Sequence, residues 1–162
     1  MLPDGFAGVT VAAAIEEWDS AAIEDGKAER GEVTLFIQPG KIRACCQFLK
    51  QKLQFERLSN VTAVDRLPAE PRFEIVYHLH SIERSERLRL VCRLGGGNPE
   101  IDSVVSVWSA ADWYEREVFD LFGVAFKGHP NLKRLLMPED WVGHPLRKDF
   151  PVHGKRYEYR DE

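Results

Sequence analysis

Two carboxylates in the stretch from Glu115 to Arg134 are the side chains whose placement most clearly calls for chemistry. On an ideal helix that starts at Trp113, Glu115 and Glu117 fall among aromatic and aliphatic neighbours, in otherwise apolar sectors. A buried carboxylate without a partner is costly or takes up a proton, so each is expected to pair with a cation. The alternative is that both carboxylates lie at a solvated rim.

Cations for such pairs are abundant just after this helix. They are Lys127, Lys133, Arg134, Arg147 and Lys148. The one arc of the helix without apolar groups holds Arg116 and Asp120, which are spaced i, i+4 and are expected to pair with each other. A helix that is apolar almost all round belongs inside a large core or against another protein, and in a chain of 162 residues contact with a second protein is favoured.

The cysteines and two of the histidines lack a supporting ligand pattern. Cys45, Cys46 and Cys92 are too few for an iron–sulfur cluster, which needs about four thiolates, so core packing is favoured. His78 and His80 share one face of a predicted strand, as a zinc-binding pair would. No clear third ligand accompanies them, and a half-exposed sheet face is favoured over a metal site.

Two further histidines precede prolines in a repeated pattern: Gly128-His129-Pro130 and Gly143-His144-Pro145, each followed by a leucine and two cations. Proline forces the preceding residue into an extended conformation. These histidines could act in acid–base catalysis, but the rigid setting favours tethers that hold the tail in place. The glycines at 95–97 lack the lysine and hydroxyl of a phosphate-binding loop.

Charge is unevenly distributed along the chain. The net charge of −4 gives no general case for nucleic acid or an anionic membrane as partner, although residues 127–162 carry eight Lys or Arg against six Asp or Glu. No apolar run reaches the roughly 20 residues needed to cross a bilayer, and direct membrane insertion is not expected. The odd cysteine count favours a reducing cytoplasm.

Hydrophobic periodicity predicts helices, strands and a long irregular tail. Helices are expected at 10–22 and 41–53, with a central helix that Ser109 caps and Gly123 ends; strands are expected at 33–37, 55–67, 73–82, 87–94 and 104–107, with a loop at 24–32. Residues 73–94 form a hairpin. We therefore expect a helix-and-strand body over residues 1–126, followed by an extended basic partner-binding tail over 127–162.

The central stretch resembles a known family signature. The run Glu115–Val124, with Phe126, Gly128-His129-Pro130 and Leu132-Lys133-Arg134, closely resembles the 30 kDa subunit of NADH-quinone oxidoreductase, which belongs to the peripheral arm of respiratory complex I. The resemblance continues through residues 60–65, 73–79 and 143–151, and covers roughly 33–151 in order.

The resemblance implies an α+β fold with a mixed β-sheet packed by helices. It also implies that this chain holds no cofactor, that FMN and iron–sulfur clusters lie in partner subunits, and that the tail clamps the quinone-site subunit of complex I and lies near the subunit beside it. No catalytic residues are implied. The signature and interface positions are Glu115, Arg116, Glu117, Asp120, Phe122, Gly123, Gly128, His129, Pro130, Leu132, Arg134, His144, Pro145, Arg147 and Lys148.

The function expected from this resemblance is that of a non-catalytic structural subunit in a proton-translocating NADH:quinone oxidoreductase. The chain would lie on the cytoplasmic side of the cell membrane, attached through its partners. Two alternatives stay open: the equivalent subunit of a complex that uses ferredoxin, F420H2 or a hydrogenase module, and a stand-alone metal-dependent enzyme that uses His78, His80 and a tail histidine.

Overall fold

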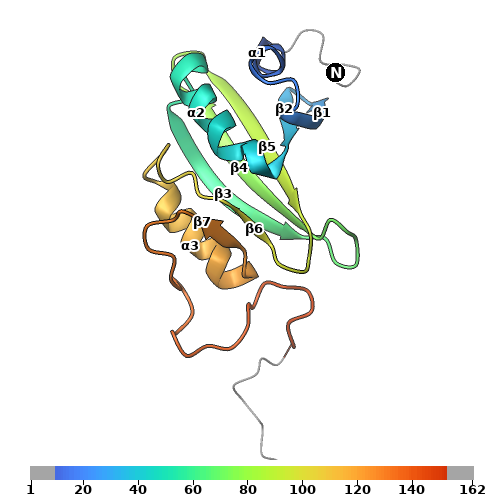
Figure 1. The fold of residues 1–162 in the computed structure, drawn as a ribbon, viewed down its shortest axis with the longest axis vertical. Helices are drawn as coiled ribbons and strands as arrows, with labels where there is room; N and C mark the ends of the chain where they lie inside the picture. The colour runs from blue at the N-terminus through green and yellow to red at the C-terminus, as the bar shows by residue number, and fades with distance from the viewer. Residues whose placement is uncertain (1–9, 153–162) are drawn as a thin grey trace, which may run out of the picture.

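A five-stranded mixed sheet forms the centre of the computed structural model, which describes residues 10–152 (Figure 1). The spatial order is β1-β2-β5-β4-β3, with β2 and β5 parallel and every other neighbouring pair antiparallel. The strands are β1 (Ile23–Glu29), β2 (Glu32–Ile37), β3 (Arg57–Asp65), β4 (Phe73–Ser81) and β5 (Glu86–Leu94). The expected α+β class and the hairpin of residues 73–94 are confirmed.

Three helices and a small second sheet complete the fold. The helices are α1 (Thr10–Trp18), α2 (Ile42–Leu53), which follows a short 3-10 turn at Pro39–Lys41, and α3 (Ala111–Phe122). The second sheet pairs β6 (Glu100–Asp102) with β7 (Ala125–Lys127) in parallel, on either side of α3 in the sequence. In Figure 1, α2 crosses one face of the large sheet and α3 lies beside its β3 edge.

The main core lies between this helix-bearing face and the helices. Alternate residues of β3, β4 and β5 point into it, as the period of two in a strand requires, and meet the apolar sides of α1, α2 and α3. Cys45, Cys46 and Cys92 are buried there as free thiols, and burial raises the pKa of Cys45 to about 12. The expectation that the cysteines serve the core is confirmed.

Several boundaries differ from the sequence predictions. The predicted loop at 24–32 is a hairpin, in which the two-residue turn Arg30-Gly31 has positive φ at both positions (54° and 79°). Its charged composition is compatible with an edge strand, where polar side chains discourage further pairing. The 104–107 segment forms turns instead of a strand, α1 ends at Trp18, and Ser109 does not cap α3, since the residue before the helix is Ala110.

The described tail has no regular structure after β7, yet it stays in contact with the body. It runs around α3 (Figure 1) and its far end reaches the turn between β3 and β4, where Asp149 pairs with Arg72. Within residues 10–152, none of the helices is long and apolar enough to cross a membrane.

Candidate functional site

Helix α3 places Glu115 inside the core. The side chain is fully buried; Oε2 accepts a hydrogen bond from Ser103 Oγ at 2.6 Å, and Oε1 accepts one from the Val104 N–H at 2.7 Å. Burial raises the pKa of Glu115 to about 7, although both hydrogen bonds oppose that rise. The expected cation is absent from the described surroundings of Glu115, so that expectation was wrong: a hydroxyl, a backbone N–H and a raised pKa take its place.

Glu117 and Asp120 exchange the roles expected of them. Glu117 is exposed, and no ion pair joins it to another residue of the described chain, whereas Asp120 is fully buried. The expected surface pair of Arg116 with Asp120 was also wrong, because both side chains are buried. The ideal-helix prediction assigned burial from the residue types on each side of α3. In the structure, the tail covers the polar side, which holds Asp120, and Glu117 is left in solvent.

Asp120 holds the tail through both of its carboxylate oxygens. Oδ2 accepts three consecutive backbone N–H groups, those of Leu135, Leu136 and Met137, at 3.0, 2.7 and 2.8 Å. Oδ1 accepts Nη1 of Arg134 at 2.7 Å. Burial alone would raise the pKa of Asp120, but the backbone N–H groups and the Arg134 guanidinium outweigh it and lower the pKa.

The two arginines beside Asp120 fix the tail further by binding its carbonyl groups. Arg134 donates through Nη2 to the carbonyls of Trp141 and Gly143, at 2.9 and 3.1 Å, and so closes the loop that follows it. Arg116 donates to the carbonyls of Lys133 and Arg134, both at 3.2 Å, and its guanidinium lies 4.9 Å from the Trp113 ring. The planar fork of arginine suits this multiple bonding.

The tail also satisfies the carbonyl groups left open at the end of α3. The last carbonyls of a helix have no partner within it. Here His144 Nδ1 donates to the Asp120 carbonyl at 2.8 Å, the Leu146 N–H donates to that of Leu121 at 3.0 Å, and Arg147 Nε donates to that of Phe122 at 2.5 Å. A cation at the C-terminal end of a helix is also stabilised by the partial negative charge of the helix dipole there.

Gly123 makes this close approach possible. It ends α3 with φ of 73°, a conformation that glycine adopts without strain. A Cβ at this position would lie 2.5 Å from His144 Cδ2 and 2.6 Å from Arg147 Nη2. The glycine therefore ends the helix, as expected, and also leaves the space that His144 and Arg147 occupy.

A second anchor lies at the turn between β3 and β4. Arg72 is buried and bridges two carboxylates, Asp65 at 2.7 Å and Asp149 of the tail at 2.8 Å. The Arg72 guanidinium holds the pKa of Asp65 well below its usual range. The backbone N–H of Lys148 also donates to Asp65 at 2.9 Å, and its ammonium group reaches the Leu67 carbonyl.

The remaining signature residues support the turn that leaves β7. His129 Nε2 lies 3.2 Å from the Asp112 carbonyl in the first turn of α3, and its Nδ1 accepts the Asn131 N–H at 3.0 Å. Gly128 has φ of 79° and starts this turn. Leu132 packs against the core, Phe122 is buried within it, and Pro130 and Pro145 follow the two histidines. Both histidines act as tethers, as favoured from the sequence.

Sequence reasoning missed the partners of these groups. Asp65 and Arg72 lie seven residues apart, on either side of the β3–β4 turn, and Asp149 lies 77 residues beyond Arg72. Ser103 reaches Glu115 from outside the helix. The only sequence feature that could have indicated the Asp65 site is an aspartate at the end of a predicted strand, followed by a turn with two prolines.

While Arg134, His144 and Arg147 point toward α3, the tail presents apolar side chains to solvent. The exposed fractions of Leu136, Val142 and Leu146 are 57%, 64% and 52%. The backbone N–H groups of Leu136 and Leu146 are bonded to α3, and the carbonyls on either side of Val142 are bonded to Arg134, so the backbone at all three positions is held in place. Ordered, exposed aliphatic groups of this kind are typical of a surface that another protein covers.

The histidine pair on the sheet has no third ligand within the described residues. Within residues 10–152, no group of three or more His, Cys, Asp or Glu side chains could hold a metal ion. His78 instead accepts a hydrogen bond from Arg89 Nε at 3.2 Å, and burial together with this arginine lowers the pKa of His78. The sheet-face interpretation of His78 and His80 is the one that the geometry supports.

Fold and site together define an α+β protein with an irregular tail that is bonded along one helix. The family model described as "Respiratory-chain NADH dehydrogenase, 30 Kd subunit" matches residues 35–156, and the chain belongs to this family.

Individual relatives agree with this assignment. The chain is 50% identical over 141 residues to the corresponding subunit of the NADH-quinone oxidoreductase of Geobacter metallireducens, covering 86% of this chain and 87% of the relative. It is 46% identical over 140 residues to the same subunit of Geotalea uraniireducens, with coverage of 86% and 85%.

Two solved structures share the fold. A trypsin-resistant fragment of Nqo5 aligns with a TM-score of 0.66 at 25% identity, over 75% of this chain and 98% of the fragment. A chain of the membrane-bound sulfane sulfur reductase, an archaeal respiratory membrane complex, aligns with a TM-score of 0.69 at 29% identity, over 88% and 84%.

Proposed function

We propose that this chain serves as a non-catalytic structural subunit in the peripheral arm of a proton-translocating NADH:quinone oxidoreductase. The observation that carries the proposal is that charged and aliphatic side chains of the tail point in different directions. Three of its charged side chains, Arg134, Arg147 and Asp149, bind α3 and the β3–β4 turn, and its aliphatic side chains at 136, 142 and 146 face outward. Electron transfer from NADH to quinone is then supported by holding other subunits in place.

The partner on this surface is the quinone-site subunit, with its neighbouring subunit close by. Residues 127–162 act as the partner-binding segment on a body formed by residues 1–126. The basic residues contribute indirectly: Arg134 and Arg147 fix the shape of the tail, and the aliphatic groups make the contact. This differs from a tail that offers its cations to an acidic partner.

The cofactors belong to partner subunits in this proposal. FMN and iron–sulfur clusters need phosphate-binding loops or thiolate sets, and each of the three cysteines here is a buried core thiol. The chain is attached to the cytoplasmic side of the membrane through its partners.

The equivalent subunit of a related respiratory membrane complex is the second candidate. The likeness to the archaeal sulfane sulfur reductase chain supports it, since the alignment spans 88% of this chain. Identities of 46% and 50% to the corresponding subunits of NADH-quinone oxidoreductases favour the NADH-linked complex.

Affinity purification from native membranes tests the proposal. A tagged wild-type chain should recover the quinone-site subunit and its neighbour together with NADH:quinone activity, and V142D/L146D should lose both. Because the substituted side chains are exposed, the isolated variant should keep its melting temperature, and Ile82→Asp, an exposed apolar position on the β4–β5 hairpin, should behave as wild type. Normal recovery of partners by V142D/L146D would contradict the proposal.

A further inference from the structure

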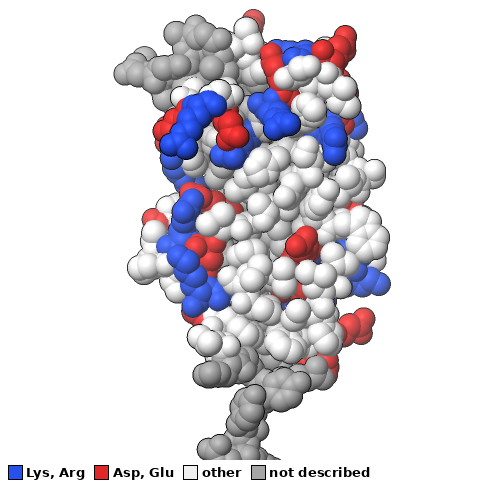
Figure 2. Space-filling model, turned by 180° about the vertical axis from the view of Figure 1, so that it is seen from behind, with Lys and Arg blue, Asp and Glu red and all other residues white. Residues whose placement is uncertain are grey.

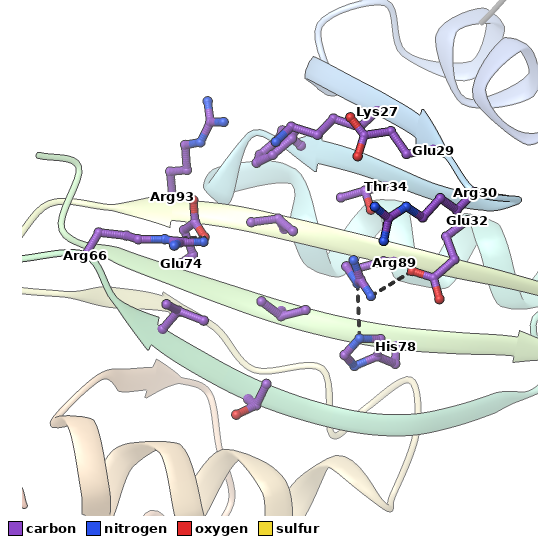
Figure 3. Close-up of a pocket in the computed structure, with 15 residues that line it drawn as sticks. Lys27, Glu29, Arg30, Glu32, Thr34, Arg66, Glu74, His78, Arg89 and Arg93 are labelled. Atoms are coloured by element: carbon purple, nitrogen blue, oxygen red, sulfur yellow. Dashed lines mark hydrogen bonds and ion pairs between the residues drawn. The ribbon is translucent and has the colours of Figure 1, made fainter. Parts of the chain in front are cut away.

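The face of the large sheet that points away from α2 is open and hollowed. Figure 2 views the molecule from this side and shows charged side chains around an uncharged centre. Figure 3 shows one hollow on this face. A second hollow, lined by Arg57, His80 and Arg87 and not drawn in Figure 3, adjoins it at Glu32, His78 and Arg89; we call the two together the sheet groove, which outward-facing residues of β1 to β5 form. It lies on the opposite side of the sheet from the core that α3 and the tail complete, so it is separate from the surface proposed above.

An apolar row forms the floor of the sheet groove. The strand register places Thr62, Val76, Val91 and Phe36 side by side across β3, β4, β5 and β2. Phe36, Val76 and Val91 form a cluster of their own, separate from the main core. Arg93 lies 3.9 Å above the Phe36 ring, so a long cationic side chain covers part of the row.

Cations outnumber acids around this floor. The groove is lined by seven Lys or Arg (Lys27, Arg30, Arg57, Arg66, Arg87, Arg89 and Arg93) against three glutamates (Glu29, Glu32 and Glu74). Asp25 lies at the border, 4.0 Å from Arg93, and still leaves an excess of cations. The whole chain carries −4, so this basic face contrasts with an acidic remainder.

Three of the four groove cations that form no ion pair in the described chain gather at one end; the fourth, Lys27, lies 5.8 Å from the Phe36 ring. At the far end, Arg66 pairs with Glu74 at 2.7 Å; toward the end that holds Arg30, Arg89 pairs with Glu32 at 3.1 Å (Figure 3). Arg30, Arg57 and Arg87 are exposed and form no ion pair with any residue between 10 and 152. The register joins Arg57 to His80 and His80 to Arg87 in one cross-strand row.

We propose that the sheet groove is a second docking surface, which receives an acidic segment with an apolar centre from a neighbouring subunit. The inference rests on the proposed role as an assembly subunit. Carboxylates of the segment would meet the free arginines. Its apolar side chains would take the place of Arg93 and Lys27 over the Phe36–Val76–Val91 row, whose side chains are 5%, 8% and 5% exposed in the free chain. Four strands span about 14 Å, which matches one side of a helix of roughly nine residues.

The shape of the groove favours a protein segment over an anionic membrane. Its apolar floor is recessed between charged walls, and Glu29 and Glu32 lie at the end where the free arginines gather. A flat lipid surface would meet these glutamates before it reached the floor. A segment of a folded partner can enter the groove and place its charges individually.

Cross-linking in the assembled complex tests what occupies the groove. Photoreactive p-benzoyl-phenylalanine in place of Asn60, which lies opposite His78 on the outer face, should cross-link another subunit at a segment with more Asp and Glu than Lys and Arg. The same group in place of Gln47, exposed on α2, serves as the comparison. Cross-links from position 60 only to lipid, only to this chain or to a second copy of it, or none at all, would overturn the proposal.

Charge reversal tests the electrostatic part. R57E/R87E should lower the recovery of partner subunits about tenfold, because like charges would then face each other, and R57K/R87K should retain it. Q47E/Q51E/K52E on α2 makes the same change in net charge on the opposite side, at exposed positions that form no ion pair with any residue between 10 and 152. It should recover partners normally, while all three isolated variants keep the wild-type melting temperature.

The two proposed docking surfaces can be rejected independently by these variants. Loss of partners in V142D/L146D with normal recovery in R57E/R87E would reject the sheet groove and leave the proposed function standing. Loss in R57E/R87E with normal recovery in V142D/L146D would reject the tail surface instead.

Discussion

Asp120 organises more of the tail than its size would indicate. Its two oxygens bind one guanidinium and three consecutive backbone N–H groups, and its own carbonyl receives His144. Each N–H would otherwise be turned toward a poorly hydrated surface, where an unsatisfied donor costs about 1–3 kcal/mol. The residue acts as a folding element for the segment that follows Arg134.

Removing this carboxylate should therefore cost far more than removing its exposed neighbour. Asp120→Ala leaves Arg134 and the three N–H groups without their acceptor and should destabilise the isolated chain by about 3–5 kcal/mol. Glu117→Ala should change its stability by less than about 0.5 kcal/mol. Urea unfolding of both variants measures the difference, and equal effects would show that the tail is not held through Asp120.

Glu115 should make stability depend on pH in a particular direction. Its pKa is about 7 in the folded chain, above the ordinary carboxyl value of 4.5, so the folded state keeps a proton that the unfolded state releases. Its contribution to stability is fully present below pH 4.5 and is lost as pH rises to 7. This window lies above that of Asp65 and Asp120, whose lowered pKa values remove stability only in acid.

Glu115→Gln isolates this effect, because the amide resembles the protonated carboxyl and can donate to Ser103 while accepting from Val104. The variant should be more stable than wild type at pH 8, by on the order of 3 kcal/mol, and equal to it near pH 4.5. Thermal melts across this range provide the test. Comparison with wild type also cancels the opposite trend from His78 and His144, whose lowered pKa values remove stability below about pH 6.5. A variant less stable than wild type at pH 8 would refute the buried-acid account.

At the scale of elements, the junction of α3 with the tail depends on Gly123. Gly123→Ala would add about 1–2 kcal/mol of backbone strain and a Cβ where His144 lies. We expect the Leu146 amide, bonded to the Leu121 carbonyl, to exchange its hydrogen at least about tenfold faster. Gly97→Ala is the matched control, since its Cβ would meet nothing within 4 Å. Unchanged exchange at Leu146 in the Gly123 variant would contradict this role.

The sequence predicts helices and strands better than it predicts the tertiary contacts that bury their side chains. Helix α2, the β4–β5 hairpin and the end of α3 at Gly123 follow from local periodicity and from a residue suited to positive φ. The roles of Glu117 and Asp120 could not be predicted, because they depend on Arg134, which lies 14 residues beyond Asp120 on an irregular path. Likewise, the β1–β2 hairpin was not predicted, because its charged residues and the Arg30-Gly31 turn lack the alternation of apolar and polar residues that indicates a strand.

At the scale of the whole molecule, three kinds of surface surround the described body. The helix side is closed, the tail side presents ordered aliphatic groups, and the open sheet face presents free arginines over an apolar row. A protein with two different outward surfaces can join two neighbours. The family resemblance supplied the identity of the complex, while the distribution of polar contacts required the three-dimensional structure.

The central claim is that the tail is already folded on α3 in the free chain and is covered only by its partner. Hydroxyl-radical footprinting of the isolated chain and of the purified complex tests it directly, since it reports the exposure of individual side chains. Leu136, Val142 and Leu146 should be reactive in the isolated chain and strongly protected in the complex, while buried Leu121 is protected in both. Equal reactivity of the three aliphatic side chains in both samples, or a reactive Leu121 in the isolated chain, would contradict the claim.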